Sequence, residues 1–244
     1  MEQAEKNSMT NGNEIPEPVN GDRDLRDIWA ASRSLTLSLV CSASFLILFA
    51  WLSEEVFEGG LQRFDLSVRM KVHEFFSPQL TKFMQDMTFL GSIAFLTALF
   101  AVIVAVWLAK GMKRPAVWLA IAVGGSVILD VSLKLSFHRT RPVPFVGAVP
   151  LTYSFPSGHA LSSFCFYGVL AGLLCARIQS QAIRIFVWTV SGALVLAIGL
   201  SRIYLGVHYP TDVLAGYIAA AAWVSTLLFA ARAKRHAKLQ KQQG

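Results

Sequence analysis

Long runs of apolar residues without a charged side chain constrain this sequence more than any other feature. The clearest two are residues 34–53 and 87–109, which contain no Asp, Glu, Lys or Arg. A helix of about 20 apolar residues crosses the hydrocarbon core of a bilayer and satisfies its own backbone hydrogen bonds there. Four further apolar runs follow, at residues 115–137, 158–176, 185–201 and 211–231. The sequence therefore predicts an all-α protein, a transmembrane helical bundle of six spans.

The overall composition agrees with a membrane protein and argues against a nucleic-acid binder. Hydrophobic residues make up 54% of the 244 residues and charged residues only 15%, whereas a soluble domain has about 25% charged residues. The formal net charge is +7, but the basic side chains gather at the ends of apolar runs, as membrane orientation requires. The three cysteines lie inside apolar runs without metal-ligand or disulfide spacing, which is typical of small hydrophobic residues.

Polar segments flank the six-span region and interrupt it once. Residues 1–32 are polar, acidic and contain prolines, which predicts a disordered cytoplasmic tail. Residues 33–231 form the membrane domain, and residues 232–244 form a basic cytoplasmic tail. Between the first two spans, residues 61–76 carry apolar side chains at helical spacing among charged ones, which predicts an amphipathic interfacial helix. The same stretch also alternates from residue 64 to residue 72, so the pattern alone leaves a strand open.

The basic residues also predict how the spans are oriented. Six spans place both termini on one side, together with basic turns at residues 110–114 and 177–184. The positive-inside rule assigns that side to the cytoplasm. Loops at residues 54–86, 137–157 and 202–210 then face the periplasm or the cell exterior. The expected location is therefore the cell membrane, with several passes.

The first motif in these outward loops is Lys134 followed, after six residues, by Arg141 and Pro142. A guanidinium matches phosphate oxygens with two parallel donors, and a lysine adds a point charge. Ionisable groups at membrane depth are costly and mark functional sites by default. The alternative is that both cations are interfacial residues whose side chains reach the headgroups. Asp130 lies one turn before Lys134 and is expected to pair with it.

The second motif is Pro156-Ser157-Gly158-His159, at the start of the fourth span. Ser157 suits the N-cap of that helix, and Gly158 allows a ligand to approach the backbone closely. The free amides at a helix start attract anions, and His159 is expected beside whatever anion binds there. A capped helix with an interfacial histidine is the structural alternative.

The third motif runs from Ser201-Arg202 through His208 to Asp212, between the fifth and sixth spans. Pro210 suits the first turn of the sixth span, which places Asp212 in that turn and within reach of His208. A carboxylate on one ring nitrogen fixes the tautomer and leaves the other nitrogen as a nucleophile. We therefore predict that His208 attacks a phosphate, that Asp212 orients it and that Arg202 holds the phosphate oxygens. The alternative is a helix-start carboxylate beside a polar loop.

Taken together, the three motifs resemble those of the type 2 phosphatidic acid phosphatase family, in the family's order and spacing, over residues 35–230. The resemblance implies that His208 forms a phosphohistidine, that Asp212 orients it and that His159 protonates the leaving oxygen. It implies that five further residues bind the phosphate, namely Lys134, Arg141, Ser157, Gly158 and Arg202. It implies neither a metal nor a cofactor. The pattern gives no role to the residues between the two cations of the first motif, His138, Arg139 and Thr140.

Six spans argue for a lipid substrate whose phosphate stays at the interface, because a soluble enzyme could carry the same catalytic residues. The resemblance implies a phosphomonoester or pyrophosphate of a lipid, and the choice stays open among undecaprenyl pyrophosphate, phosphatidylglycerophosphate, phosphatidic acid and lipid A phosphates. A membrane transporter or channel is one rival, but it predicts charges near the middle of spans, and only Asp130 lies deeper. A vanadate-dependent haloperoxidase shares the anion site, but those relatives are soluble. The oligomeric state does not follow from the sequence.

Overall fold

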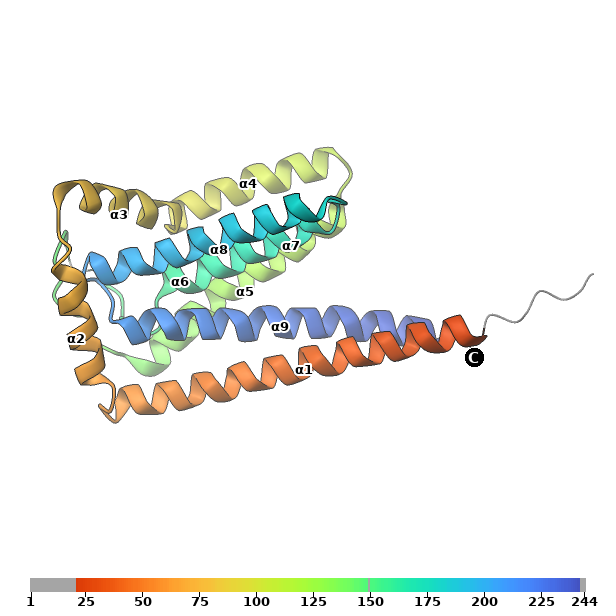
Figure 1. Cartoon of the computed structure of the whole chain (residues 1–244), viewed down its shortest axis with the longest axis horizontal. Helices are drawn as coiled ribbons and strands as arrows, with labels where there is room; N and C mark the ends of the chain where they lie inside the picture. Colours follow the sequence, from red (N-terminus) through yellow and green to blue (C-terminus); the bar gives the residue numbers. More distant parts are fainter. Residues whose placement is uncertain (1–20, 149, 242–244) are drawn as a thin grey trace, which may run out of the picture.

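The computed structural model describes residues 21–148 and 150–241, and within these ranges the protein is all-α (Figure 1). Five helices are long and apolar enough to cross a membrane, and a bent helix pair makes a sixth span when it is counted as one. The elements in chain order are α1 Gly21–Phe57, α2 Gln62–His73, α3 Pro78–Leu90, α4 Ile93–Ala109, α5 Lys113–Phe137, α6 Gly158–Ser163, η1 Phe164–Gly168, α7 Val169–Cys175, α8 Gln181–Tyr204 and α9 Pro210–Lys241. The prediction of a six-span helical bundle is confirmed.

The first and last helices, α1 and α9, pack side by side (Figure 1). Near their free ends the Ser32 hydroxyl hydrogen bonds with His236 Nε2 at 2.9 Å. Residues 21–32 are helical, where the sequence predicted a disordered tail, because α1 continues along its partner. The remainder of that tail, residues 1–20, lies outside the described residues. The basic segment predicted to start at residue 232 continues α9 as helix.

The second span is a bent pair of helices rather than the continuous run predicted for residues 87–109. The break falls at Gly91 and Ser92, and the helices α3 and α4 meet there at 49°. Ser92 caps α4 by accepting a hydrogen bond from the Phe95 amide at 3.2 Å. A Cβ atom on Gly91 would lie 2.4 Å from a methyl carbon of Ile198 in α8. Glycine therefore allows the bend to pack closely against α8.

The fourth span lies at the centre of the bundle, in contact with α5, α8 and α9. It consists of α6, the π-helical turn η1 and α7, and Leu161, Cys165 and Phe166 within it are fully buried. Gly216 lets α9 approach its start, because a Cβ atom there would lie 2.7 Å from the Ser157 carbonyl oxygen. This close approach joins the two helix starts that carry the second and third motifs.

Helix α2 crosses one end of the bundle, where it connects α1 to α3 (Figure 1). It confirms the amphipathic helix predicted within residues 61–76. Its charged residues Asp65 and Arg69 are buried against the protein, whereas Phe64 and Met70 are exposed. The buried Asp65 and Arg69 therefore lie on the side of α2 that closes the end of the bundle, and the outward side carries both apolar residues and the exposed cations Arg63 and Lys71.

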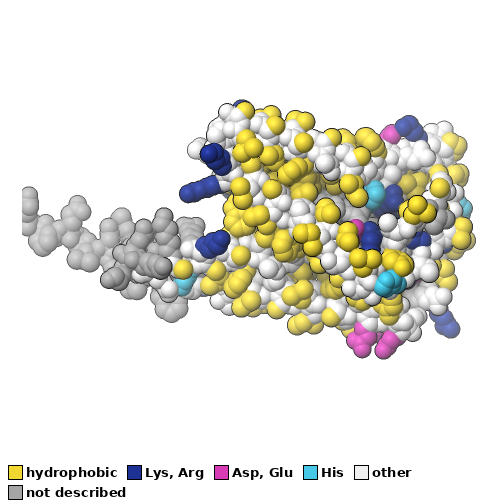
Figure 2. All heavy atoms as spheres, turned by 180° about the vertical axis from the view of Figure 1, so that it is seen from behind, with side chains coloured by type: hydrophobic (Ala, Val, Ile, Leu, Met, Phe, Trp, Pro, Cys, Tyr) yellow, Lys and Arg dark blue, Asp and Glu magenta, His cyan; other side chains and the backbone are white. Residues whose placement is uncertain are grey.

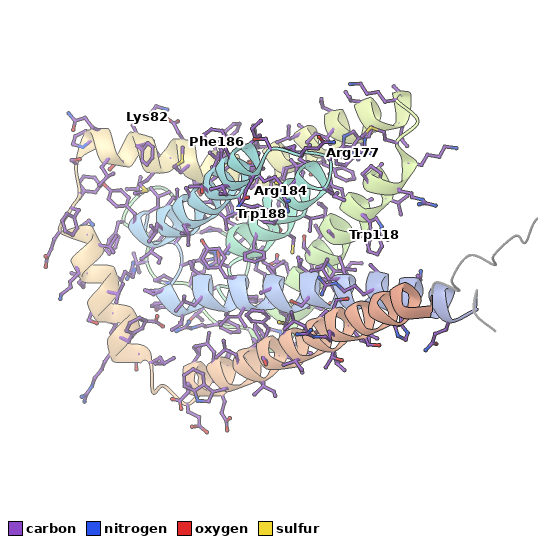
Figure 3. All side chains as sticks on the ribbon, turned by 45° about the vertical axis from the view of Figure 1, so that its right-hand side comes forward. Lys82, Trp118, Arg177, Arg184, Phe186 and Trp188 are labelled. Carbon is purple, nitrogen blue, oxygen red and sulfur yellow. The ribbon has the colours of Figure 1, made fainter. Side chains whose placement is uncertain are left out.

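The two ends of the bundle carry different segments. The loops after α5 and α8 lie at the α2 end, and the turns after α4 and α7 lie at the other end with the C-terminus (Figure 1). Figure 3 shows Arg177 and Arg184 on the side of the α7–α8 turn, and Lys82 of α3 toward the opposite end. The face between the ends is largely hydrophobic (Figure 2). All three motifs lie at the α2 end, as the predicted topology requires.

Candidate active site

One cavity of about 610 Å³ collects residues of all three motifs. Six of the eight predicted site residues line it, namely Lys134, Arg141, Gly158, His159, Arg202 and His208. The other two, Ser157 and Asp212, are fully buried and adjoin lining residues. The structure therefore brings every predicted site residue to one place.

His208 is almost fully buried and is held by the start of α9. Its Nδ1 lies 3.4 Å from Oδ2 of Asp212, which the first turn of α9 carries. The same carboxylate oxygen accepts hydrogen bonds from the Tyr209 amide at 2.8 Å and from the Ser154 hydroxyl. Helix α9 begins at Pro210, as predicted. The expected pairing of the histidine with the aspartate is therefore present.

The other ring nitrogen of His208, Nε2, lies 2.9 Å from Nη1 of Arg141. A guanidinium only donates hydrogen bonds, so Nε2 is the acceptor and the ring proton is on Nδ1, facing Asp212. Burial lowers the pKa of His208 to about 4, although the Asp212 carboxylate opposes the shift. His208 is therefore a neutral imidazole whose Nε2 carries a lone pair, which is the state that a nucleophile needs.

Three cations reach the cavity from three different elements. Lys134 comes from α5, Arg141 from the loop after it and Arg202 from α8. Lys134 Nζ lies 2.8 Å from Asp130 Oδ2, which confirms the predicted pair. Arg202 donates to the Thr88 hydroxyl, but its Nε is buried without a hydrogen-bond partner among the described residues. One carboxylate among three cations leaves an excess of positive charge, which favours an anionic ligand.

The start of α6 adds further donors to this charge. Ser157 occupies the predicted N-cap position, but its side chain makes no capping bond, and its hydroxyl is buried without a partner in the described part of the chain. Its backbone amide donates to the Asp212 carbonyl at 2.9 Å and so ties α6 to α9. A Cβ atom on Gly158 would lie 2.9 Å from both carboxylate oxygens of Asp130. Glycine at this position therefore lets the Asp130–Lys134 pair lie against the helix start.

Arg139, which had no predicted role, joins two buried carboxylates. Its Nη1 lies 2.6 Å from Asp212 and its Nη2 lies 2.8 Å from Asp65 of α2. Burial alone would lower the pKa of Arg139, but the charges of Asp212 and Asp65 outweigh it and raise the pKa. A signal was available, because Asp65 falls on the helical stripe of Val68 and Val72. A carboxylate in an apolar stripe needs a buried partner.

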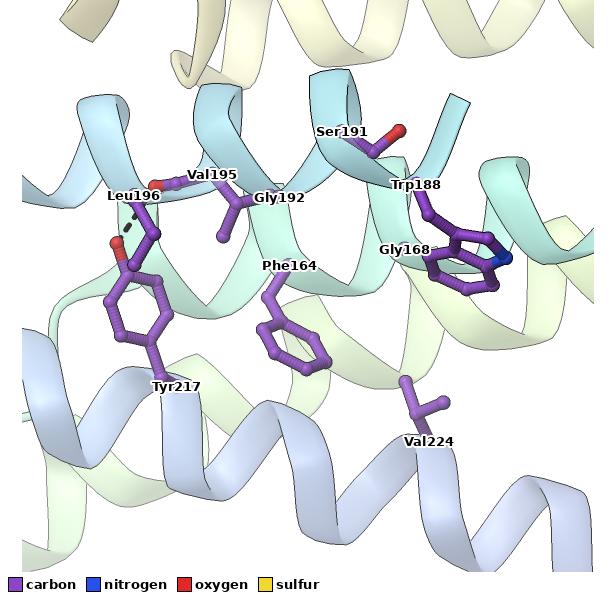
Figure 4. Close-up of a pocket in the computed structure, with 9 residues that line it drawn as sticks. All are labelled: Phe164, Gly168, Trp188, Ser191, Gly192, Val195, Leu196, Tyr217 and Val224. Carbon is purple, nitrogen blue, oxygen red and sulfur yellow. Dashed lines mark hydrogen bonds between the residues drawn. The ribbon is translucent and has the colours of Figure 1, made fainter. Parts of the chain in front are cut away.

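A second cavity, of about 410 Å³, lies between α8, the fourth span and α9 (Figure 4). Its lining is apolar apart from Ser191 and the aromatic residues Trp188 and Tyr217, and the Tyr217 hydroxyl donates to the Val195 carbonyl at 2.7 Å. Lipid hydrocarbon fits such a space, but no cation lines it to hold a phosphate. The cavity that the motifs share is therefore the candidate active site.

Comparison with known families finds that the model of the PAP2 superfamily matches residues 115–236, which contain all three motifs. Phosphatidylglycerophosphatase B of Bacillus subtilis is 29% identical over 177 residues, which cover 71% of this chain and 86% of that protein. Undecaprenyl-diphosphatase of Sulfolobus acidocaldarius is 29% identical over 124 residues, which cover 48% of this chain and 55% of that protein.

Solved structures share the fold as well. A transmembrane PAP2 type phosphatidylglycerolphosphate phosphatase from Bacillus subtilis superposes with a TM-score of 0.69 at 27% identity, and the match covers 81% of this chain and 96% of that one. LpxE of Aquifex aeolicus superposes with a TM-score of 0.51 at 25% identity, over 67% of this chain and 94% of that one. The helical membrane bundle is thus common to these proteins.

Proposed function

The chain belongs to the PAP2 superfamily and is a membrane lipid phosphatase, and from this premise we propose that it acts through a phosphohistidine on His208. The observation that carries the proposal is the contact of His208 with Asp212 at one nitrogen and with Arg141 at the other. That pair of contacts supports a neutral ring whose Nε2 lone pair faces Arg141, one of the proposed phosphate-binding cations. Phosphoryl transfer asks mainly for such positioning and charge stabilisation.

In the first step, Nε2 of His208 bonds to phosphorus as the bond from phosphorus to the leaving oxygen breaks. The positive charge that develops on the ring is stabilised by the Asp212 carboxylate at Nδ1. Arg141 transfers the one hydrogen bond that its Nη1 donates to Nε2 to a phosphate oxygen. The remaining oxygens are held by four further groups, which are Lys134, Arg202, the Ser157 hydroxyl and the amide of Gly158.

His159 supplies the proton that the leaving oxygen takes up. Its neighbours include the cations Arg202, Lys134 and Arg141, so its protonated form depends on the negative charge that a bound phosphate brings. In the second step a water attacks phosphorus, His159 accepts the water proton, and the bond from nitrogen to phosphorus breaks. Inorganic phosphate leaves, and both histidines return to their starting state.

The substrate we propose is a lipid phosphomonoester or pyrophosphate whose chain lies beside the cavity. Ile93, Val131 and Leu135 line the same cavity and are 72%, 50% and 60% exposed. Their apolar surface lies where α4 and α5 border the cavity, which supports lateral entry of an acyl or prenyl chain from the bilayer. The names of the relatives favour phosphatidylglycerophosphate and undecaprenyl pyrophosphate, and phosphatidic acid is a third candidate.

We place the site at the outer face of the cell membrane. The support is the basic end of the bundle, where the turn after α7 carries Arg177 and the first turn of α8 carries Arg184 (Figure 3). Cytoplasmic loops are enriched in such residues. The described ends of the chain, Gly21 of α1 and Lys241 of α9, lie at that end (Figure 1), so we place the tails of residues 1–32 and 232–244 in the cytoplasm.

The test is phosphate release from purified lipids in detergent, with wild-type protein and His208→Ala side by side. The panel holds phosphatidylglycerophosphate, undecaprenyl pyrophosphate, phosphatidic acid and a water-soluble phosphomonoester. We expect wild-type turnover of at least one lipid well above the soluble ester, and none by His208→Ala. Equal rates in the two proteins would remove His208 as the nucleophile, and a preference for the soluble ester would remove the lipid assignment.

A further inference from the structure

An ionic network behind the catalytic pair reaches as far as α2. Asp65 and Asp212 are both fully buried, and the Arg139 guanidinium bonds to one at 2.8 Å and to the other at 2.6 Å. Thr211 strengthens the network, because its amide and hydroxyl donate to Asp65 at 3.0 Å and 2.7 Å. None of these four residues lines the cavity. The network, which includes Asp212, therefore lies behind His208 and lines no part of the cavity.

The network divides the two oxygens of Asp212 between two tasks. Oδ1 binds Arg139, while Oδ2 faces His208 Nδ1 and accepts from the Tyr209 amide and the Ser154 hydroxyl. A carboxylate fixed at one oxygen by a charged hydrogen bond does not rotate freely. Arg139 therefore fixes Oδ1, and together with the Tyr209 amide and the Ser154 hydroxyl it orients Oδ2 toward the histidine.

The charges of the network also suit the proposed reaction. Two carboxylates and one guanidinium carry one net negative charge next to His208. His208 becomes positive when its Nε2 bonds to phosphorus, and a compensating charge that is already in place costs no reorganisation at that moment. The other charged or titratable groups that face His208 are Arg141, Arg202 and His159, which all stand on the phosphate side.

We propose that Asp65 and Arg139 are positioning residues, which act through Asp212 to set the orientation of His208. The inference rests on the proposed function of His208. It gives α2 a part in catalysis, although no α2 side chain lines the cavity. A second contact fixes α2 in the same place, because Arg69 donates to the carbonyls of Val143 and Gly206 on the two loops that surround the site.

The first test compares Asp65→Asn with Asp86→Asn, a matched control. Asp86 forms an exposed ion pair with Lys82 in α3, so the control removes the same charge from a residue outside the network. We expect Asp65→Asn to lower kcat about 10- to 100-fold with KM changed less than about twofold, because the phosphate-binding cations are untouched. Asp86→Asn is expected to keep both constants at the wild-type value.

A double-variant cycle separates positioning from a general loss of structure. If Asp65 acts through Asp212, then Asp65→Asn causes no further loss once Asp212→Asn is present. Losses that multiply would show that the two residues act independently, and the inference would fall. Thermal unfolding in detergent accompanies each variant, so that a drop in kcat is scored only for folded protein.

Arg139→Lys provides an independent variant should Asp65→Asn not fold. Lysine keeps the charge of Arg139 but lacks the fork that bridges two carboxylates. As for Asp65→Asn, we expect kcat to fall, by about tenfold or more, while KM stays at the wild-type value. A wild-type kcat in whichever of the two variants folds would overturn the inference.

The outcome for this inference is distinguishable from the outcome for the proposed function. If His208→Ala is active, the phosphohistidine proposal fails first. If His208→Ala is inactive while the folded Asp65→Asn protein turns over normally, only the positioning role of Asp65 and Arg139 fails.

Discussion

Two cavities lie against the fourth span and α8, and they differ in almost every group that lines them. The larger, of about 610 Å³, is lined by three cations and two histidines. The smaller, of about 410 Å³, is lined almost wholly by carbon (Figure 4). Both are built from the same central helices, so the fold by itself does not make a site. The difference lies in the ionisable residues, which the chain concentrates at one end of these helices and which are costly at membrane depth unless they are paired or bind a charged ligand.

The nucleophile of the larger cavity is the residue whose loss should reduce activity most. His208→Ala removes the only proposed nucleophile and is expected to lower kcat by about 10⁴-fold or more. Ser191→Ala changes a lining residue of the apolar cavity and is expected to leave kcat unchanged. Phosphate release from phosphatidylglycerophosphate in detergent measures both. Turnover by His208→Ala within about tenfold of wild type would show that the two cavities do not differ as we argue.

Loss of a cation from the larger cavity should have the next largest effect on activity. Helix α8 carries both the residue to be tested, Arg202, and a control arginine, Arg184. Arg202→Leu removes a buried guanidinium that faces the site and is expected to lower kcat by about 10²- to 10³-fold. Arg184→Leu makes the same change at the other end of α8, where it is exposed, and leaves the rate unaltered. Initial rates of phosphate release at saturating lipid give kcat for the two variants and for wild type. Similar losses in the two variants would mean that Arg202 acts through stability alone.

Each of the two cavities is lined by a glycine, and the two glycines differ in the space around them. A Cβ atom on Gly158 would meet Asp130 at 2.9 Å and Lys134 at 3.0 Å, whereas a Cβ atom on Gly192 in the apolar cavity meets nothing within 4 Å. Gly158→Ala therefore displaces the lysine and is expected to reduce kcat/KM by about 10- to 100-fold. Gly192→Ala is expected to match wild type. The ratio of kcat/KM between the two variants is the measurement, and a ratio near one would contradict the assigned role of Gly158.

The dependence of rate on pH tests the electrostatics of the larger cavity. Protonated His208 cannot attack phosphorus, and burial lowers its pKa to about 4. Activity should therefore persist as the pH falls through the ordinary histidine range and disappear only as the pH approaches that value. Loss of the His159 proton from the substrate complex should lower the rate at alkaline pH and produce a bell-shaped profile. A flat profile, or half of the activity lost near the unperturbed histidine pKa, would argue against this pairing.

Removal of metal ions by a chelator should change activity least of all. No group of three His, Cys, Asp or Glu residues within the described ranges is arranged to hold a metal ion, and the resemblance of the motifs implies none. EDTA should change kcat by less than about twofold, because the cations of the protein supply the charge that a metal would otherwise bring. Loss of activity that added divalent metal restores would contradict this expectation.

Much of this architecture was predictable because bilayers impose strong constraints on sequence. Apolar runs of span length predicted the six spans, and the alternation of spans placed all three motifs at one end. His208 and Asp212 met as expected because Pro210 starts α9 and sets their separation. Local rules of helix start and charge were sufficient for these features.

Other features depend on tertiary contacts that no local rule contains. The break at Gly91 and Ser92 does not interrupt the hydrophobicity of the second run, so the sequence pattern does not reveal it. The bend depends on the close packing of Gly91 against Ile198, a contact between distant parts of the chain. Arg139 looked like an ordinary loop cation, because its partners Asp65 and Asp212 lie more than 70 residues away on either side. Ion pairs between residues so far apart in the sequence can be identified once the fold is known, but not from the spacing of residues along the chain.

The most direct test of the central claim is to trap the covalent intermediate. Wild-type protein mixed with lipid carrying labelled phosphate, quenched within one turnover and digested at alkaline pH, is examined by mass spectrometry for a phosphorylated histidine. We predict that the label lies on His208, that it is stable to base and lost in acid, and that it is absent from His208→Ala. Label on another residue, or turnover with no phosphoenzyme detected in a single-turnover experiment, would contradict the account.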